Sequence, residues 1–425
     1  MIDFLNKLPR RLLSGRLLVR RAATLSVGRG AASLLSAAWV IVVARHLSVG
    51  QFGEVSVALA LVVILGTLSD FGLQNILAKD VVETGRIRRA VLDSVVARRL
   101  VLAAISIVLL VVLFVIATHE RNLAVPFVFG LSIAGVAMYN STLTAYRALG
   151  NIRLEIASEI GSRALVLVAG GLWVANGGGV IAVGVAYSAV GLAIGLLDYL
   201  LVRSKSASAP IDHPLPSFSP RAAAPFALAN TVSAIYQRID NYLLALLRGT
   251  AAAGIYGASY RFQDMIMILP VALGQLALSD VSGTDPRMRM STGRRVAAQS
   301  ALLTLVPAIV IAVFAQPLLT FLFGSPYAVA APIVVLLMIS TVPGAAAVAL
   351  SLLAAVTDPR RFAIASGSSL VVNVVVNLVL IPPFSGVGAG VAMVISQTYL
   401  VAAFYWVLWR KSTELNVAAG TTGRA

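Results

Sequence analysis

No charged side chain occurs between Val296 and Thr357, where 62 residues read VAAQSALLTLVPAIVIAVFAQPLLTFLFGSPYAVAAPIVVLLMISTVPGAAAVALSLLAAVT. A helix that crosses a bilayer needs about 20 mostly apolar residues, so this stretch is long enough for two. It is interrupted at Gln316-Pro317 and at Gly324-Ser-Pro326, and proline and glycine end helices. Transmembrane strands would instead alternate apolar and polar residues. The stretch therefore predicts two membrane-spanning helices.

The composition of the whole chain agrees with a membrane protein. Of 425 residues, 59% are hydrophobic and 12% are charged, and the mean hydropathy is +0.92. Soluble domains are about a quarter charged, and a soluble chain this apolar would lack polar groups to cover its surface. In a membrane protein the net charge of +16 indicates topology rather than binding to nucleic acid. The absence of Cys and the wide spacing of three His residues predict no metal site and no cofactor.

Other apolar stretches bring the number of expected spans to twelve. They cover residues 23–44, 55–78, 100–118, 122–146, 164–197 (two spans), 222–247, 254–279 and 362–409 (two spans). Gly- and Pro-rich breaks divide the two longest of them. We expect an all-α integral membrane protein with twelve transmembrane helices in two pseudo-symmetric six-helix bundles around a central cavity.

A Ser- and Pro-rich segment near the middle of the chain has the composition of a linker. A shift of 201 residues lays Phe52-Gly53 on Ala253-Gly254, which indicates that the two halves are repeats. With six spans each, the halves would share one orientation. The expected parts are a basic amphipathic segment (1–22), an N-terminal bundle (23–203), a linker (204–220), a C-terminal bundle (221–410) and a tail (411–425).

Basic residues concentrate in alternate connections between the expected spans. Most of the 33 Lys and Arg lie in the N-terminal segment, 79–99, 147–163, 203–221, 287–295, 360–361 and the tail. Cytoplasmic loops carry such an excess, so we expect both termini in the cytoplasm. The first apolar stretch has span length, and we expect no cleavable signal peptide.

The sequence lacks motifs that would indicate a membrane-bound enzyme. It has no G-x-x-x-x-G-K-[ST] phosphate loop and no Asp-x-Asp pair for a metal-dependent sugar-nucleotide reaction. The expected outward loops are also too short to carry a catalytic domain. The sequence therefore predicts a transporter, not an enzyme.

Short motifs in both halves resemble one transporter family. Ala44-Arg-His-Leu-Ser-Val-Gly-Gln-Phe-Gly53 and Leu68-Ser-Asp-Phe-Gly-Leu73 are similar to the opening of the polysaccharide flippases. Arg238-Ile-Asp240 and Gly254-Ile-Tyr-Gly-Ala-Ser-Tyr-Arg261 resemble that family's seventh span and its entry to the eighth. The resemblance covers about residues 20–410. These flippases belong to the multidrug/oligosaccharidyl-lipid/polysaccharide (MOP) exporter superfamily.

The resemblance implies a specific cargo, membrane and set of partners. The cargo would be an undecaprenyl-diphosphate-linked oligosaccharide, such as a repeat unit of lipopolysaccharide O-antigen, capsule or exopolysaccharide. It would cross the bacterial inner membrane by alternating access, next to a glycan polymerase or export machinery.

Two other transporter classes remain alternatives to a polysaccharide flippase. One is a multidrug or cation efflux antiporter of the same superfamily, in which acids and aromatics should dominate the cavity. The other is a sugar transporter of the major facilitator type, whose Asp-Arg loop motif is missing from Val82-Glu-Thr-Gly-Arg-Ile-Arg-Arg89.

Arginines in or beside the spans are the candidate substrate-binding residues, because a guanidinium binds a diphosphate through bidentate, charge-assisted hydrogen bonds. Arg261 either contacts the phosphates or pairs with Asp264 three residues later. Arg29 either meets the diphosphate as it enters or is an ordinary interfacial arginine. Arg238 either binds substrate or joins a lateral charge network near Asp240.

Acidic residues in the spans are the candidates for ion coupling or a charge network. Charges at this depth are costly and normally have a partner or line a cavity. Asp240 either binds a coupling cation or serves helix packing, and Asp264 either couples an ion or pairs with Arg261. Asp70 lies near the end of a span, and it either takes part in coupling or a charge network or has only a structural role.

Overall fold

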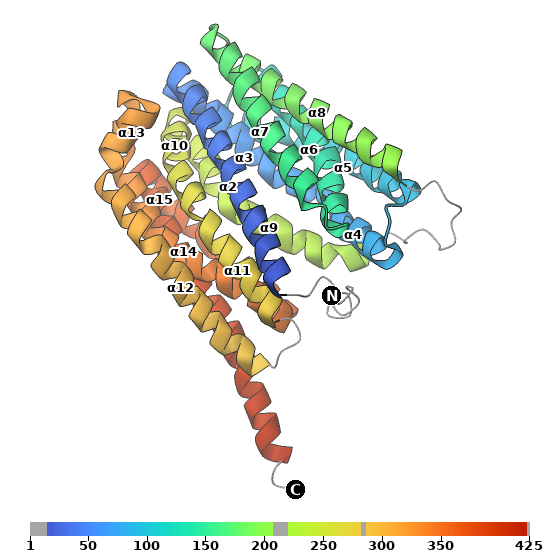
Figure 1. Cartoon of the computed structure of the whole chain (residues 1–425). Coiled ribbons are helices and arrows are strands. Elements are labelled where there is room, and N and C mark those ends of the chain that lie inside the picture. The colour runs from blue at the N-terminus through green and yellow to red at the C-terminus, as the bar shows by residue number, and fades with distance from the viewer. Residues whose placement is uncertain (1–14, 207–219, 282–285, 423–425) are drawn as a thin grey trace. The chain divides into compact units, whose positions relative to one another are not determined.

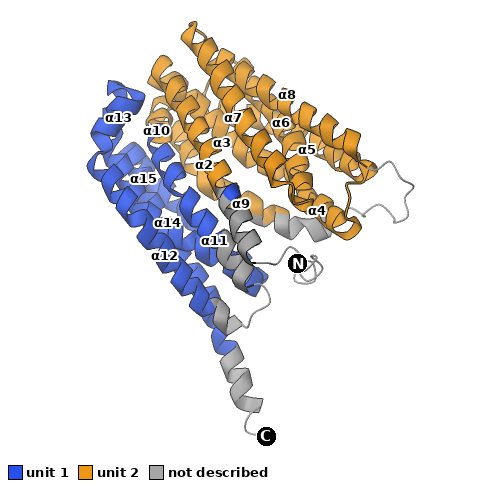
Figure 2. Ribbon diagram, in the orientation of Figure 1, with its two compact units in different colours: residues 1–26, 258–425 blue, residues 27–257 orange. Residues whose placement is uncertain are grey.

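The computed structural model describes residues 15–206, 220–281 and 286–422, and within these ranges the regular secondary structure is helical (Figure 1). The helices divide into two compact units. Unit 2 comprises residues 27–257, and unit 1 comprises residues 258–425 with the N-terminal residues up to Ser26 (Figure 2). The chain passes from one unit to the other after Ser26 and after Gly257, and both of these points fall inside helices. The expected linker (204–220) lies mostly outside the described residues, as do residues 1–14 of the basic N-terminal segment, and the expected bundle boundaries stay a prediction.

Among the described residues, unit 2 contains most of one helix, the next seven helices and the start of another. They are α2 (Gly15–His46), α3 (Val49–Asp70), α4 (Leu73–Thr84), α5 (Arg89–Thr118), α6 (Ala124–Ala148), α7 (Ile152–Ala175), α8 (Val180–Lys205), α9 (Pro220–Arg248) and α10 (Thr250–Ile266). Within the unit, α6 packs on α5 and α8, α7 packs on α8, and α3 packs on α5 and α9.

Unit 1 contains the end of α10 and the remaining helices. They are α11 (Ile268–Val281), α12 (Pro286–Val313), α13 (Ala315–Phe323), the short 3-10 helix η2 (Ser325–Ala330), α14 (Ala331–Thr357) and α15 (Pro359–Thr422). α14 lies at the centre of this unit, in contact with α11, α12 and α15. A core that includes Leu350, Leu353, Phe404 and Leu408 joins these helices.

The predicted all-α membrane fold is confirmed. Nine helices of the described chain are long and apolar enough to cross a membrane. One of them, α15, holds two expected spans that meet at Ser385, where φ is 52°. The other two expected spans correspond to α9 and to α10 with α11, so each of the twelve expected spans has its helix.

Three helix boundaries differ from the expected spans. The stretch 55–78 breaks after α3, because Phe71 and Gly72 both adopt left-handed backbone angles. The stretch 254–279 breaks at Met267, since Pro270 cannot donate to the carbonyl of Ile266 and its ring clashes there. Residues 152–163, expected in a cytoplasmic connection, form the first half of α7.

One apolar face of α5 is exposed, as a lipid-facing helix requires. Val101, Ile105, Val108, Val112 and Ile116 are all exposed at helical spacing. The opposite face is buried and includes Ala103, Ser106, Leu110 and Phe114. A helix that is apolar on both its buried and its exposed side belongs in a bilayer.

Glycines bring helix backbones into direct contact at two places in unit 2. A methyl group added to Gly135 on α6 would overlap the backbone of Gly191 on α8, so small residues let these two helices pack closely. A methyl group on Gly53 of α3 would overlap the carbonyl oxygen of Thr250 on α10. One on Gly254 of α10 would overlap the carbonyl oxygen of Val49. The two glycines that the 201-residue shift equates are therefore packing partners.

This contact predicts a position-specific effect of alanine on α3. Gly53→Ala should lower the free energy of unfolding by about 1–3 kcal/mol, because the new methyl group has no room beside Thr250. Gly66→Ala on the same helix is the matched control, since nothing lies within 4 Å of its added methyl group. It should be neutral or stabilise by about 0.5–1 kcal/mol, as alanine does in a helix. Thermal unfolding of the purified variants measures both, and equal stability of the two would contradict the contact.

Candidate functional site

A buried carboxylate at the start of α7 holds two arginines from two other helices. Glu155 is fully buried, and its Oε1 accepts hydrogen bonds from Arg147 Nη2 at 2.6 Å and Arg147 Nε at 3.0 Å. Arg29 Nη2 donates to the same oxygen at 3.3 Å. Arg29 comes from α2 and Arg147 from the last turn of α6. We call these three residues the Glu155 cluster.

Local sequence explains why the cluster forms at this point. The side chain of Asn151 caps α7 by accepting a hydrogen bond from Leu154 N, so Glu155 lies in the first turn. Negative charge is favoured there by the helix dipole. Next to Arg29, a methyl group on Gly28 would lie 2.6 Å from the side chain of Ile156, which shows that α2 approaches α7 closely. The close approach lets Arg29 reach Glu155.

The Glu155 cluster has a net positive charge and remains open to solvent. The side chains of Arg29 and Arg147 are 31% and 51% exposed, whereas that of Glu155 is 0% exposed. Each guanidinium carries five N–H donors, and one carboxylate oxygen can satisfy only a few of them. The donors that do not face Glu155 are available to an anion, and two guanidiniums match the geometry of phosphate oxygens.

A second buried ion pair joins α3, α5 and α6. Arg99 is fully buried; its Nε lies 3.6 Å from Asp70 Oδ1, and its Nη1 donates to Ser141 Oγ at 2.9 Å. Asp70 is the last residue of α3 and is also buried. Asp70, a candidate for ion coupling or a charge network, thus has a cationic partner in the structure. Breaking such a buried pair leaves an uncompensated charge, so the pair constrains the three helices relative to one another.

The carboxylate of Asp240 contacts a tyrosine hydroxyl of the next helix. Asp240 on α9 is buried, and its Oδ2 accepts a hydrogen bond from the hydroxyl of Tyr256 on α10 at 2.9 Å. Arg238, two residues earlier on α9, is partly buried. Tyr256 itself is 1% exposed, so it serves packing and the bond to Asp240 rather than an open surface.

Arg261 and Asp264 form the pair that their spacing on α10 predicts. Arg261 Nη1 lies 3.2 Å from Asp264 Oδ2, and the two side chains are 23% and 33% exposed. The pairing does not exclude substrate binding, because one guanidinium can contact a carboxylate and an anion at the same time. Among the described residues, no three His, Asp or Glu side chains lie close enough to hold a metal ion.

The sequence patterns do not single out three charged members of these contacts, namely Glu155, Arg147 and Arg99. All three lie in segments that were expected to be cytoplasmic connections, because charge interrupts an apolar run. Glu155, Glu159 and Arg163 nevertheless recur every fourth residue, which is the spacing of one helix face. That spacing is the sequence signal for an extension of α7 toward its N-terminus.

Known proteins resemble this chain in both sequence and fold. Residues 18–278 match the family described as polysaccharide biosynthesis protein. A probable low-salt glycan biosynthesis flippase, Agl15 of Haloferax volcanii, is 25% identical over 365 residues, which cover 83% of this chain and 75% of that protein.

Solved transporter structures share the fold at low sequence identity. The lipid II flippase MurJ in an inward closed conformation matches with a TM-score of 0.71 and 12% identity, over 93% of this chain and 92% of that chain. The MATE multidrug transporter DinF-BH matches with a TM-score of 0.65 and 15% identity, over 94% and 96% of the two chains. At these identities the likeness shows a common membrane-transporter fold.

Proposed function

The chain belongs to the polysaccharide biosynthesis protein family, and on this basis we propose that it is a flippase for a lipid-linked oligosaccharide. It is a multi-pass membrane transport protein and not an enzyme. The cargo that we propose is an undecaprenyl-diphosphate-linked repeat unit of O-antigen, capsule or exopolysaccharide, moved from the inner to the outer leaflet of the bacterial cytoplasmic membrane. Both chain termini would lie in the cytoplasm, and a glycan polymerase or export machinery would receive the product.

The observation that carries this proposal is the Glu155 cluster. It presents two partly exposed guanidiniums, held by one buried carboxylate, at the end of unit 2 where basic residues concentrate. The positive-inside rule assigns that end to the cytoplasm, where a lipid diphosphate would be loaded. A diphosphate is a compact dianion and suits two guanidiniums better than one. Arg261 and Arg238 are proposed as further substrate contacts, with Asp240, Asp264 and Asp70 as members of the charge network.

The same cluster favours a lipid-diphosphate flippase over a multidrug efflux antiporter. A cation exporter needs acidic groups at its loading site, whereas Arg29 and Arg147 outnumber Glu155. Like-charge repulsion would therefore exclude a cationic drug from this end of unit 2.

We propose alternating access without nucleotide hydrolysis as the mechanism. The chain has no phosphate loop. Outward movement of a dianion across a membrane whose inside is negative is favoured by about 2.3 kcal/mol per charge per 100 mV. An ion gradient is then needed only to return the empty carrier, with Asp240 or Asp264 as the carboxylate involved.

Substitution of Arg29 tests the proposed loading site. In proteoliposomes with a fluorescent diphosphate-linked glycolipid, Arg29→Ala should slow flipping about tenfold or more, because a charge-assisted hydrogen bond contributes about 1.5–3 kcal/mol. Arg45→Ala, at the other end of α2, is the control and should leave the rate unchanged. Arg29→Lys should restore part of the rate, since lysine keeps the charge but lacks the planar fork. Normal flipping by a folded Arg29→Ala variant would remove the cluster from the mechanism.

A pair of variants on α10 separates the two roles of Arg261. If Arg261 binds substrate, Arg261→Ala should abolish binding of a diphosphate-linked glycolipid, whereas Asp264→Asn should leave most of the binding, because the asparagine removes the intrahelical pair but keeps the guanidinium. A partly exposed i,i+3 pair contributes little to stability, about 0.2–0.5 kcal/mol. Both variants should therefore be recovered at the level of the native chain. Equal loss of binding in both variants would assign Arg261 to the pair alone.

A further inference from the structure

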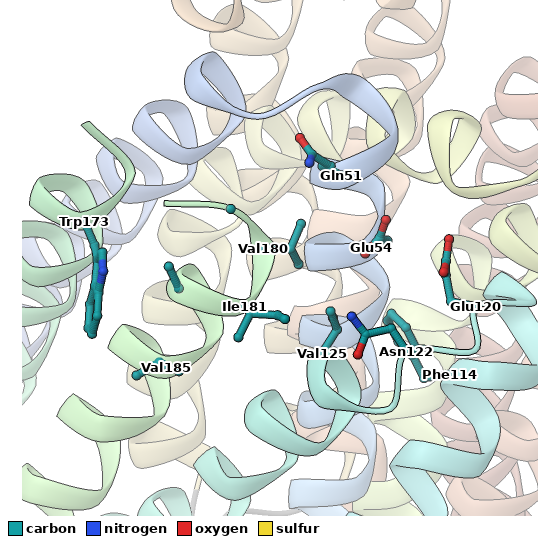
Figure 3. Close-up of a pocket in the computed structure, with 12 residues that line it drawn as sticks. Gln51, Glu54, Phe114, Glu120, Asn122, Val125, Trp173, Val180, Ile181 and Val185 are labelled. Atoms are coloured by element: carbon teal, nitrogen blue, oxygen red, sulfur yellow. The ribbon is translucent and has the colours of Figure 1, made fainter. Parts of the chain in front are cut away.

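A pocket of about 630 Å³ lies in unit 2 at the far end of α7 from the Glu155 cluster (Figure 3). Glu155 and Trp173 are 18 residues apart on this helix, which corresponds to about 27 Å. The pocket is bounded by the start of α3, the connection between α5 and α6, and the connection between α7 and α8. Its volume falls within the range of about 300–1,000 Å³ that is typical of small-molecule sites.

Two amide side chains of the pocket have their orientation fixed by the backbone. Gln51 Oε1 accepts a hydrogen bond from Ser48 N at 3.1 Å, as part of the capping box that begins α3. Asn122 Oδ1 accepts a hydrogen bond from Ala124 N at 3.0 Å. Since both oxygens are engaged by backbone donors, each amide offers its NH₂ group to a ligand. The pocket therefore has two positioned donors.

Two carboxylates supply the matching acceptors. Glu54 follows Gln51 along α3, and Glu120 precedes Asn122 in the α5–α6 connection, so both acids lie on the same side of the pocket as the two amides (Figure 3). A sugar hydroxyl both donates and accepts a hydrogen bond. Vicinal hydroxyls therefore match the amides and carboxylates on this side of the pocket, whereas the carboxylates repel an anion.

The rest of the pocket wall is apolar and includes an aromatic ring. Trp173 stands at the side away from the two acids, and Val180, Ile181 and Val185 of α8 lie between them (Figure 3). The indole is 48% exposed. An exposed aromatic ring beside an apolar wall suits the C–H face of a pyranose, while the hydroxyls turn toward the polar side.

The charge of the pocket selects among saccharides. Among the residues that the structure describes, its lining includes two carboxylates and no Lys or Arg. A uronic acid or a phosphate would meet like charge there. We propose that this pocket binds a neutral saccharide, namely the glycan part of the cargo after it has crossed the membrane. The location on the outer side rests on the proposed function and on the positive-inside assignment.

Saturation-transfer difference NMR on the full-length protein in nanodiscs tests the pocket. The probes are the methyl glycosides of glucose, galactose, mannose and N-acetylglucosamine, with methyl glucuronide as the anionic counterpart of the glucoside. At least one neutral glycoside should show saturation transfer about fivefold above the glucuronide, because the glucuronide carboxylate is repelled. Trp173→Ala should reduce the neutral signal about fivefold, and Trp173→Phe should retain it.

Matched variants control for unfolding and for non-specific contact. Trp409→Ala removes an indole of the same 48% exposure from unit 1 and should change nothing. The double variant Glu54→Gln with Glu120→Gln keeps the shape of the pocket but removes its charge, so the glucuronide signal should rise toward that of the glucoside. Absence of saturation transfer to all four neutral glycosides would overturn the proposal. So would a glucuronide signal equal to theirs in the native chain, or a neutral signal unaffected by Trp173→Ala.

Flipping of a diphosphate-linked glycolipid, measured on the same preparations, separates this proposal from the proposed function. Sugar binding without flipping would support the pocket and contradict the flippase assignment. Flipping without sugar binding would contradict the pocket alone.

Discussion

The meeting of Arg29 and Arg147 at one oxygen of the buried Glu155 is the interaction that determines the arrangement of α2, α6 and α7 at the basic end of unit 2. Two guanidiniums this close would repel each other without the carboxylate, and the carboxylate could not be buried without them. The cluster is therefore assembled before any ligand arrives. A receptor whose donors are already in place loses little conformational freedom on binding, which favours a compact anion.

The two ends of unit 2 offer opposite chemistry to the two parts of the proposed cargo. The basic end presents guanidiniums, which suit a diphosphate. The other end presents amides, an indole and the carboxylates of Glu54 and Glu120, which suit neutral sugar and repel phosphate. A carrier with this asymmetry would load the charged group on one side and would not retain it on the other.

The sequence was sufficient to predict the helices and insufficient to predict their contacts. Runs such as 296–357 predicted the spans because lipid exposure demands continuous apolar residues, and α5 shows this on its exposed face. The criterion of continuous apolar residues placed the start of α7 too late. Charged residues in a sequence indicate a polar connection unless the partners that bury them are known. Arg261 and Asp264 were predictable as a pair since they lie on one helix. Glu155 and Arg29 are 126 residues apart, and no local pattern links them.

Whether Arg29 and Arg147 recognise a diphosphate is decided by comparing how fast the native chain flips two lipids that differ only in their linkage. One would carry a glycan through a diphosphate and the other the same glycan through an uncharged linker, both in proteoliposomes without nucleotide. Our account predicts that the diphosphate-linked lipid flips about tenfold faster or more, since only it can engage the guanidiniums of Arg29 and Arg147. Equal rates for the two lipids would contradict the account.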